Sequence, residues 1–260
     1  MKVTVDEKVN SVVSNDLNNR GVLNNKEKCS KDVPVEHYVP GEPFDHTVEH
    51  SDTYYEQYIQ NFKPNNDKRL FYFFVKRLFD IVVSFIMLVA LLPIMLVIAL
   101  AIKCDSKGSV IFKQQRMGRN KKSFNCYKFR TMRTDAPRDC ATSRLKNSEQ
   151  YLTRTGRFLR KSSLDELPQL WCVLVGDMSF IGYRPLVLTE EKCNAMRDRL
   201  NVFSARPGIS GYAQVLGRDD VYYKNKAVLD AEYVKKASLL MDLKLIFMTV
   251  VVVFKKEGIK

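Results

Sequence analysis

The chain has 260 residues, enough for one substantial domain with an appended segment but short for two large independent domains. Its 42 Lys and Arg exceed its 29 Asp and Glu, and the net charge of +13 suits a partner such as nucleic acid, anionic lipid or a phosphorylated small molecule. Its three histidines, His37, His46 and His50, precede the apolar part of the sequence, so histidine-based catalysis and His-ligated metals are excluded from the rest unless this segment folds back. The six cysteines form no C-x-x-C pair and indicate neither a zinc site nor a small disulfide framework.

Residues 1–65 are rich in Asn, Ser, Glu, Lys and Pro and show no sustained apolar period. This composition is typical of a polar, disordered extension. Within it, residues 51–62 favour a short helix. Residues 1–70 hold 9 basic and 12 acidic side chains, so the remaining residues have a net charge of +16.

From Ile81 to Ile102 the sequence runs for 22 residues without a charge. At about 1.5 Å per residue, a helix of this length just covers a hydrocarbon core of roughly 30 Å, so the segment is predicted to enter a membrane. Pro93 lies at its middle and lacks a backbone donor, which predicts a sharp bend there. A bent helix can return to the side from which it entered.

Basic residues flank this segment on both sides, and Lys and Arg collect on the cytoplasmic side of a membrane. A re-entrant helical hairpin over about residues 76–103, with both ends in the cytoplasm, satisfies both flanks. A single kinked span would place one basic cluster outside, and a buried core helix would need apolar cover on every side. The flanking cations are Lys68, Arg69, Lys76 and Arg77 before the segment and Lys103, Lys107, Lys113 and Arg116 after it.

The stretch from Leu245 to Phe254 holds ten uncharged residues and is too short to span a bilayer. Charged residues lie on either side of it. The pattern predicts a C-terminal helix over about residues 239–256, which lies in the membrane interface or packs on the body.

Asp165 and Glu166 are adjacent in the stretch RKSSLDELPQL, just after several cations. Neighbouring side chains on a helix point about 100° apart, so these carboxylates cannot share one proton face to face. One could attack phosphorus while the other holds a divalent metal, which suits phosphoryl transfer. The alternative is structural, because acidic residues are favoured in the first turn of a helix that a preceding serine caps.

Four blocks of sequence resemble one known family, in its order and at its ordinary spacing. The protein resembles the bacterial sugar transferases, which are monotopic polyprenyl-phosphate phosphoglycosyl transferases, from about Lys76 to Arg218, and its C-terminus is similar to the family's end. A single D-E pair has little specificity, whereas four ordered blocks are hard to match by chance. The blocks are KRLFDIVVSFIMLVALLPIML, QQRMGRNKKSFNCYKFRTMR, GRFLRKSSLDELPQLWCVLVGDMSFIGYRPL and ARPGISGYAQVLGR.

The resemblance implies a two-step transfer of a sugar-1-phosphate from a UDP-sugar to undecaprenyl phosphate. Asp165 is the implied nucleophile, which expels UMP and carries the phosphosugar until the polyprenyl phosphate takes it. Glu166 is the implied second catalytic residue and the ligand of Mg²⁺. A diphosphate also requires cations to neutralise it, and the matching motif positions offer candidates for substrate binding at Arg116, Lys128, Arg130, Arg184 and Arg206.

Each of these candidates has an alternative interpretation. A Lys or Arg is usually solvated or meets a lipid headgroup. Gly208 and Gly211 could let the backbone approach a nucleotide or could simply make turns. Trp171 and Phe180 are predicted to be core residues rather than base-stacking residues, because their neighbours are apolar.

The sequence departs from the family pattern at three positions. Tyr183 stands where the G-P-R-P pattern has its first proline, which could alter the turn that presents Arg184. Lys121 stands where a glycine is common. Leu92 precedes Pro93 where some relatives have serine, so the bend depends on proline alone.

Together these features predict an α-rich α+β fold: a monotopic membrane-associated catalytic domain with a re-entrant helical hairpin and interfacial helices. Residues 66–260 are the expected sugar transferase domain, with a catalytic body at about 104–240. The resemblance implies the cytoplasmic face of the bacterial inner membrane, contact with membrane lipids and an initiating role in capsule, exopolysaccharide or glycan synthesis, and it leaves a homodimer open. No nucleic-acid partner is expected, because the sequence has a long apolar segment and no recognised nucleic-acid motif. The rival hypothesis is a non-enzymatic membrane-surface adaptor with a flexible acidic tail.

Overall fold

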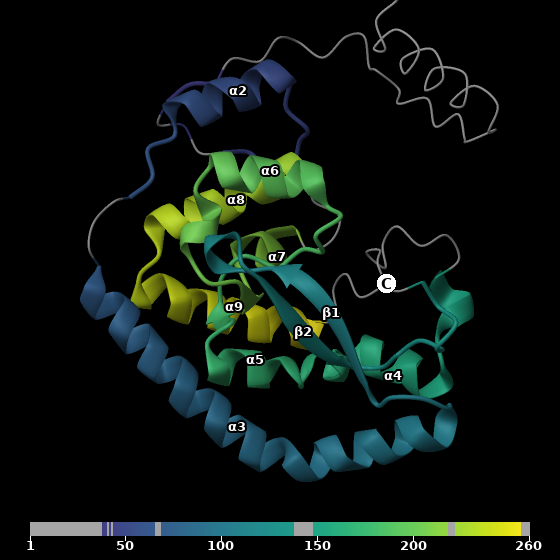
Figure 1. The fold of residues 1–260 in the computed structure, drawn as a ribbon. Helices are drawn as coiled ribbons and strands as arrows, with labels where there is room; N and C mark the ends of the chain where they lie inside the picture. The colour runs from purple at the N-terminus through teal and green to yellow at the C-terminus, as the bar shows by residue number, and fades with distance from the viewer. Residues whose placement is uncertain are drawn as a thin grey trace, which may run out of the picture. The chain divides into compact units, whose positions relative to one another are not determined.

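Helices dominate the described part of the protein, and two small sheets complete it (Figure 1). The structure, a computed structural model, describes residues 38–40, 42, 44–65, 69–137, 148–217 and 222–255, all within the unit His37–Lys260. The predicted α-rich α+β fold is confirmed. The helices are α2 (Asp52–Asn61), α3 (Leu70–Asp105), α4 (Arg154–Ser162), α5 (Gln169–Val175), α6 (Glu191–Arg199), α7 (Tyr212–Gly217), α8 (Tyr223–Lys236) and α9 (Leu239–Lys255); the strands are β1 (Ile111–Met117), β2 (Ser123–Phe129), β3 (Ser179–Ile181) and β4 (Gly208–Ser210); and the 3₁₀ turns are η1 (Arg119–Lys121), η3 (Ser148–Tyr151), η4 (Leu164–Glu166) and η5 (Val202–Ser204).

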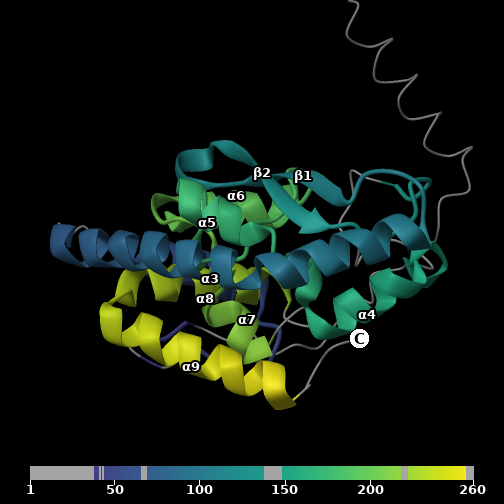
Figure 2. The ribbon, with the colours of Figure 1, turned by 90° about the horizontal axis from the view of Figure 1, so that it is seen from below.

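The apolar segment forms one continuous helix, α3, of 36 residues with Pro93 inside it. Figures 1 and 2 show this helix bent along one side of the body. It bends without reversing direction, so the helical hairpin of the sequence prediction is a single bent helix in the structure. In its most apolar window only 11% of the residues are buried, which argues against a core helix of a soluble protein.

The N-terminal half of α3 is fixed to the body by two arginines. Arg69 donates to the carbonyl oxygens of Ala237 and Val234, just after and within the last turn of α8. Arg77 donates to the carbonyl oxygens of Val173 and Leu174 at the end of α5, each at 2.7 Å. The last carbonyl groups of a helix lack the amide partners that earlier ones have, so the two guanidinium groups cap the C-terminal ends of α8 and α5.

The C-terminal end of α3 is bonded to the same body. Asp105 accepts a hydrogen bond from the amide of Thr155 at 2.8 Å. Arg130 donates to the carbonyl oxygens of Lys107 at 2.7 Å and Ser106 at 2.8 Å, directly after the helix. Both ends of α3 are therefore attached to one folded unit, and the exposed apolar stretch lies between them.

The strands β1 and β2 form an antiparallel hairpin with Ile111 opposite Phe129 and Met117 opposite Ser123. Its connection places two non-glycine residues in the left-handed region, Asn120 at φ 54° and Lys121 at φ 60°. Glycine adopts this region without the steric cost that a Cβ brings. A glycine in place of Lys121 would adopt this conformation without that cost.

The strands β3 and β4 pair in parallel, and glycines allow their backbones to meet. A Cβ on Gly208 would lie 2.1 Å from the amide nitrogen of Gly182, and a Cβ on Gly211 would lie 1.8 Å from the Gly182 carbonyl oxygen. Such distances leave no room for a side chain. Of the two interpretations left open for Gly208 and Gly211, the structure supports backbone packing.

Residues 44–62 pack against α6 and α8, although the sequence prediction placed them in a disordered extension. The predicted short helix is confirmed as α2, with Ser51 as its N-cap. Tyr58 donates to Glu232 of α8 at 2.6 Å, and a further hydrogen bond joins Tyr55 to Asn225. Buried aromatic rings supply the apolar contact area that the polar composition of this segment otherwise lacks. Tyr54, Tyr55 and Tyr58 each have less than a tenth of their surface exposed. Residues 1–37 lie outside the described ranges.

Exposed apolar side chains gather on α3, α5 and α9. Trp171 on α5 is 52% exposed, so the prediction that it is a core residue is wrong, whereas Phe180 is partly buried. The predicted C-terminal helix is present as α9 and is joined to α3 by a 2.6 Å ion pair between Asp242 and Lys76. The large exposed side chains of α9 are Leu239, Leu240, Leu243, Phe247 and Val250.

Candidate active site

Asp165 and Glu166 lie in η4, a single 3₁₀ turn between α4 and α5. α4 ends at Ser162, and Ser163 adopts the left-handed conformation with φ 57°, so the backbone turns before η4 begins. Within the residues that the structure describes, η4 receives no capping hydrogen bond from a side chain. The structure therefore does not show the capped first turn that was the structural alternative for the two acids.

A close backbone contact holds α4 beside the end of β2. A Cβ on Gly156 would lie 1.9 Å from the carbonyl oxygen of Thr131, so only glycine fits. Arg160, later in the same helix, donates from Nε to the Thr131 hydroxyl at 3.0 Å. This packing brings η4 next to β2, where Lys128 lies.

Glu166 forms the centre of a charged cluster. Its Oε1 accepts from Lys128 Nζ at 2.6 Å and from a terminal nitrogen of Arg184 at 3.3 Å. Burial alone would raise the pKa of Glu166, but the charges and hydrogen bonds of Lys128 and Arg184 lower that pKa to about 2. Glu166 is therefore ionised throughout the neutral range.

Asp165 is partly exposed and lies beside the same cations. Burial raises its pKa; Lys128 opposes that rise, the negative charge of Glu166 adds to it, and Arg160 and Arg184 oppose it further. The two neighbouring carboxylates thus have pKa values shifted in opposite directions. Such a separation is characteristic of paired acids with different roles.

A buried ion pair supports the loop that holds Arg184. Arg197 of α6 donates to the carbonyl oxygen of Arg184 at 3.0 Å and pairs with Asp230 of α8. Both members of the pair are almost wholly buried, and the Arg197 guanidinium lies 5.3 Å from the ring centre of Tyr183. Tyr183, in place of the family's first proline, fills the core beneath the loop, which still directs Arg184 toward Glu166.

Arg116 supports this loop from the other side. It donates to the carbonyl oxygen of Pro185 at 2.7 Å and to the Gln114 side chain at 2.6 Å. Burial lowers its pKa, Arg184 adds to the shift, and the negative charges of Glu166 and Glu190 oppose it. The structure therefore places Arg116 near the cluster and bonds it to the backbone next to Arg184.

The residues available for a metal ion are few. Among the residues with described positions, no group of three or more His, Cys, Asp or Glu side chains gathers as a metal site. Mg²⁺ usually keeps several waters and takes one or two carboxylates together with substrate phosphates. Asp165 and Glu166 fit that requirement as a pair, with one Glu166 oxygen shared with cations.

Comparison with known proteins places this geometry in a family. Residues 71–256 match the family described as bacterial sugar transferase. The chain belongs to the bacterial sugar transferase family. The resemblance seen in the sequence is thus confirmed, and the four blocks on which it rested are the segments that build α3, the β1–β2 hairpin, η4 with the Arg184 loop, and β4.

Three relatives show the range of the sugar transferase family. The chain is 41% identical to the undecaprenyl-phosphate glucose phosphotransferase of Komagataeibacter xylinus over 67% of this chain and 35% of that protein. It is 39% identical to the undecaprenyl-phosphate galactose phosphotransferase of Salmonella typhimurium over 71% of this chain and 41% of that protein. It is 40% identical to the uncharacterized sugar transferase EpsL of Bacillus subtilis over 72% of this chain and 90% of that protein. The chain thus spans less than half the length of the first two relatives and most of the third.

Of the five cations predicted from the sugar transferase motifs, Lys128 and Arg184 bond Glu166 directly. Arg130 and Arg206 do not join this cluster. Arg130 binds the carbonyl groups that follow α3. Arg206 donates from Nε to the carbonyl oxygen of Gly176 at 2.9 Å and lines a separate pocket.

Three residues that matter to the site were missed in the candidate set. Arg160 lies five residues before Asp165 and contributes to its electrostatic environment; the cations ahead of the D-E pair were the signal for it. Arg197 and its partner Asp230 belong to different helices, 33 residues apart. Nothing in their local sequence distinguishes them from surface charges.

Proposed function

We propose that this protein transfers a sugar-1-phosphate from a UDP-sugar to undecaprenyl phosphate, releases UMP and so initiates a capsule, exopolysaccharide or related glycan. Family membership supports the proposal, because two relatives are named as undecaprenyl-phosphate glucose and galactose phosphotransferases. The observation that carries it is the Asp165 and Glu166 pair, whose pKa values are separated within one cluster of cations. A membrane-surface adaptor has no need for such a cluster.

In the first step, a carboxylate oxygen of Asp165 attacks the β-phosphorus of the UDP-sugar. The bond from this phosphorus to the bridging oxygen breaks, and UMP leaves with the bonding electrons. Asp165 then carries the phosphosugar as an acyl phosphate. In the second step, a phosphate oxygen of undecaprenyl phosphate attacks the same phosphorus, and Asp165 leaves as a carboxylate.

The cations make Asp165 an available nucleophile. Lys128, Arg160 and Arg184 offset the burial that favours its protonated form. They also supply positive charge where a diphosphate adds negative charge, and preorganised charges of this kind are a large part of phosphoryl-transfer catalysis. Glu166, held by Lys128 and Arg184, keeps those two side chains in place. Mg²⁺ held by Glu166 would neutralise further charge on the diphosphate.

The proposed location is the cytoplasmic face of the bacterial inner membrane. α3 is long and apolar enough to enter a bilayer, and its two ends are bonded to the same body through Arg69 and Asp105. A polar body stays in water, so both ends of the helix lie on one side. Exposed Trp171 suits the membrane interface, where tryptophan is enriched.

The decisive assay supplies purified protein in detergent with a UDP-sugar, Mg²⁺ and undecaprenyl phosphate. Asp165→Asn should abolish UMP release, whereas Asp177→Asn, the same change at an exposed carboxylate, should leave it intact. Mass spectrometry before lipid addition should show a phosphosugar adduct on the peptide that contains Asp165. Full UMP release by Asp165→Asn, or wild-type protein without any UMP release across a panel of UDP-sugars, would overturn the proposal.

Topology is tested separately, because it does not depend on turnover. Single cysteines at Asn61 and Ser109, near either end of α3, are treated in intact cells with a membrane-impermeant thiol reagent. We expect both to stay unlabelled until the cells are lysed. Labelling of either one in intact cells would contradict the placement of both ends in the cytoplasm.

A further inference from the structure

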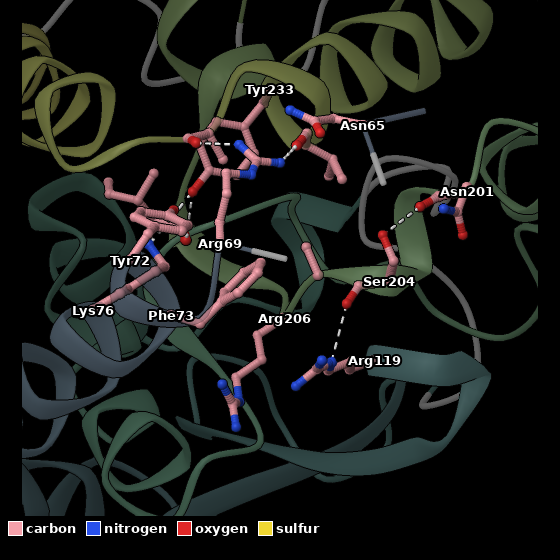
Figure 3. A pocket seen from close by; sticks show the side chains of 14 residues that line it. Asn65, Arg69, Tyr72, Phe73, Lys76, Arg119, Asn201, Ser204, Arg206 and Tyr233 are labelled. Atoms are coloured by element: carbon pink, nitrogen blue, oxygen red, sulfur yellow. Dashed lines mark hydrogen bonds between the residues drawn. The ribbon is translucent and has the colours of Figure 1, made fainter. Parts of the chain in front are cut away.

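A pocket of about 260 Å³ opens beside the N-terminal part of α3. Its wall is formed by that helix, by the end of α8, and by the segments around η1 and η5 (Figure 3). None of Asp165, Glu166, Lys128 and Arg184 lines it. It is therefore distinct from the proposed catalytic cluster.

Four cations line this pocket, and two of them are already matched. Lys76 pairs with Asp242 at 2.6 Å, and Arg69 donates to the carbonyl oxygens at the end of α8. The other two, Arg119 and Arg206, are bonded through Nε only, to the carbonyl oxygens of Ser204 and Gly176, in the ranges that the structure describes.

In the described ranges, the terminal nitrogens of Arg119 and Arg206 therefore have no hydrogen-bond partner. Figure 3 shows both side chains leaving neighbouring segments on the side of the pocket away from Arg69 and Tyr233. Burial lowers the pKa of Arg206, the nearby charges of Arg119 and Arg77 lower it further, and the charge of Asp80 opposes the shift. Among the described lining residues there is no Asp or Glu. An anion in the pocket would relieve this repulsion.

The pocket also has an apolar side that continues into the exposed face of α3. Phe73 lines the pocket and is 40% exposed. Leu70 and Phe74, its neighbours on the helix, are 72% and 67% exposed. The cations thus lie next to an exposed apolar surface. The phosphate of a lipid headgroup would contact the cations, and the acyl chains of the same lipid would contact the apolar side chains of α3.

We propose that this pocket binds the phosphate of an anionic glycerophospholipid from the surrounding membrane, with Arg119 and Arg206 as its donors. Paired guanidinium groups match phosphate geometry and give strong, charge-assisted hydrogen bonds. The volume is below the roughly 300–1,000 Å³ of pockets that enclose drug-sized ligands, so a headgroup fits better than a whole nucleotide sugar. The site would hold the body at a fixed height and orientation on the membrane.

The test measures lipid binding to the full-length protein in detergent micelles by native mass spectrometry. The probes are dioctanoyl phosphatidylglycerol, its phosphatidylcholine counterpart and sn-glycerol 3-phosphate. The variants are Arg119→Gln, Arg206→Gln and the charge-conserving Arg206→Lys. Arg133→Gln is the matched control, since Arg133 is an exposed arginine outside the pocket.

We expect phosphatidylglycerol to bind the wild-type and Arg133→Gln proteins equally, and each pocket Arg→Gln variant about tenfold more weakly, the loss typical of one charge-assisted hydrogen bond. Arg206→Lys should retain part of the affinity. Equal binding of both dioctanoyl lipids, equal binding of glycerol 3-phosphate, or no loss in Arg119→Gln would overturn the proposal. Arg119 is exposed, so this variant remains a test even if Arg206→Gln misfolds.

The inference rests on the membrane placement proposed above and not on the transfer reaction. Lipid binding is measured without a UDP-sugar, so its failure and the failure of UMP release are separate results. UMP release in the Arg119→Gln variant should stay near wild type in detergent, where no bilayer is present to orient the body. A loss of turnover in detergent that matches the loss of lipid binding would assign Arg119 to the substrate instead.

Discussion

The buried pair of Arg197 and Asp230 allows the most direct test of how the site is held. Their side chains are 0% and 1% exposed, and Arg197 also donates to the Arg184 carbonyl oxygen. Asp230→Ala would leave a buried guanidinium without its counter-ion, which costs about 3–5 kcal/mol. Since each kcal/mol lowers Tm by about 2–4 °C in a domain of this size, we expect Tm to fall by roughly 6–20 °C.

Two matched variants give this prediction its controls. Glu56→Ala removes an acid from an exposed ion pair with Arg199, whose members are 52% and 49% exposed, and should cost less than about 1 kcal/mol. The double variant Arg197→Met/Asp230→Leu replaces the charges with apolar groups and should recover most of the lost stability. It still lacks the donor to the Arg184 loop, so UMP release should remain low while Tm recovers.

The assay is thermal unfolding in detergent, followed by circular dichroism at several scan rates because unfolding of such proteins is often irreversible. The reasoning fails if Asp230→Ala melts within about 2 °C of Glu56→Ala, a difference of less than about 1 kcal/mol. It also fails if the double variant is no more stable than Asp230→Ala. In either case the pair would not be the support for the loop that its burial indicates.

Three further predictions concern the site and its scaffold. Lys128→Gln removes a positive charge that lowers the pKa of Asp165, so the pKa of Asp165 should rise. The acidic limb of the pH profile of UMP release should then move to higher pH. A shift to lower pH would contradict the assignment. Gly156→Ala places a Cβ 1.9 Å from the Thr131 carbonyl oxygen. It should lower the free energy of unfolding by more than about 1 kcal/mol and reduce UMP release. An unchanged Tm would show that the backbone can shift to accept the methyl group. Lys121→Gly relieves a left-handed residue at φ 60° and should raise stability by up to about 1 kcal/mol in denaturant titration. A loss of that size would mean that the exposed ion pair of Lys121 with Asp198 contributes more than the backbone strain costs.

The sequence predicts the elements best where one strong local signal acts. The 22 uncharged residues from Ile81 predict a membrane helix, and α3 contains all of them. Their composition cannot reveal that polar groups on the same helix are bonded to the body, as Asp80 is to Ser179 and to the amide of Phe180. The helix is therefore longer than its apolar part, and it bends where a hairpin was expected.

Residues 44–62 show how a polar composition can hide a packed segment. Tyr54, Tyr55 and Tyr58 occupy one face of a helix, since they are separated by one, three and four positions. A pattern so short is easily lost among acidic and amide residues. Burial of these rings against α6 and α8 depends on surfaces that lie more than about 130 residues further along the chain, which no local pattern can display.

The motifs predict five cations as one group, and the structure shows that their contacts differ. Lys128 is the penultimate residue of β2 and Arg130 directly follows that strand, so the two side chains leave the extended backbone on the same side. Nevertheless Lys128 binds Glu166, and Arg130 binds the backbone after α3. The difference lies in their surroundings: η4 lies beside Lys128, whereas the residues that follow α3 lie beside Arg130. An arginine that a motif contains can therefore act through the scaffold, by fixing the end of α3 to the strand from which the neighbouring lysine reaches Glu166.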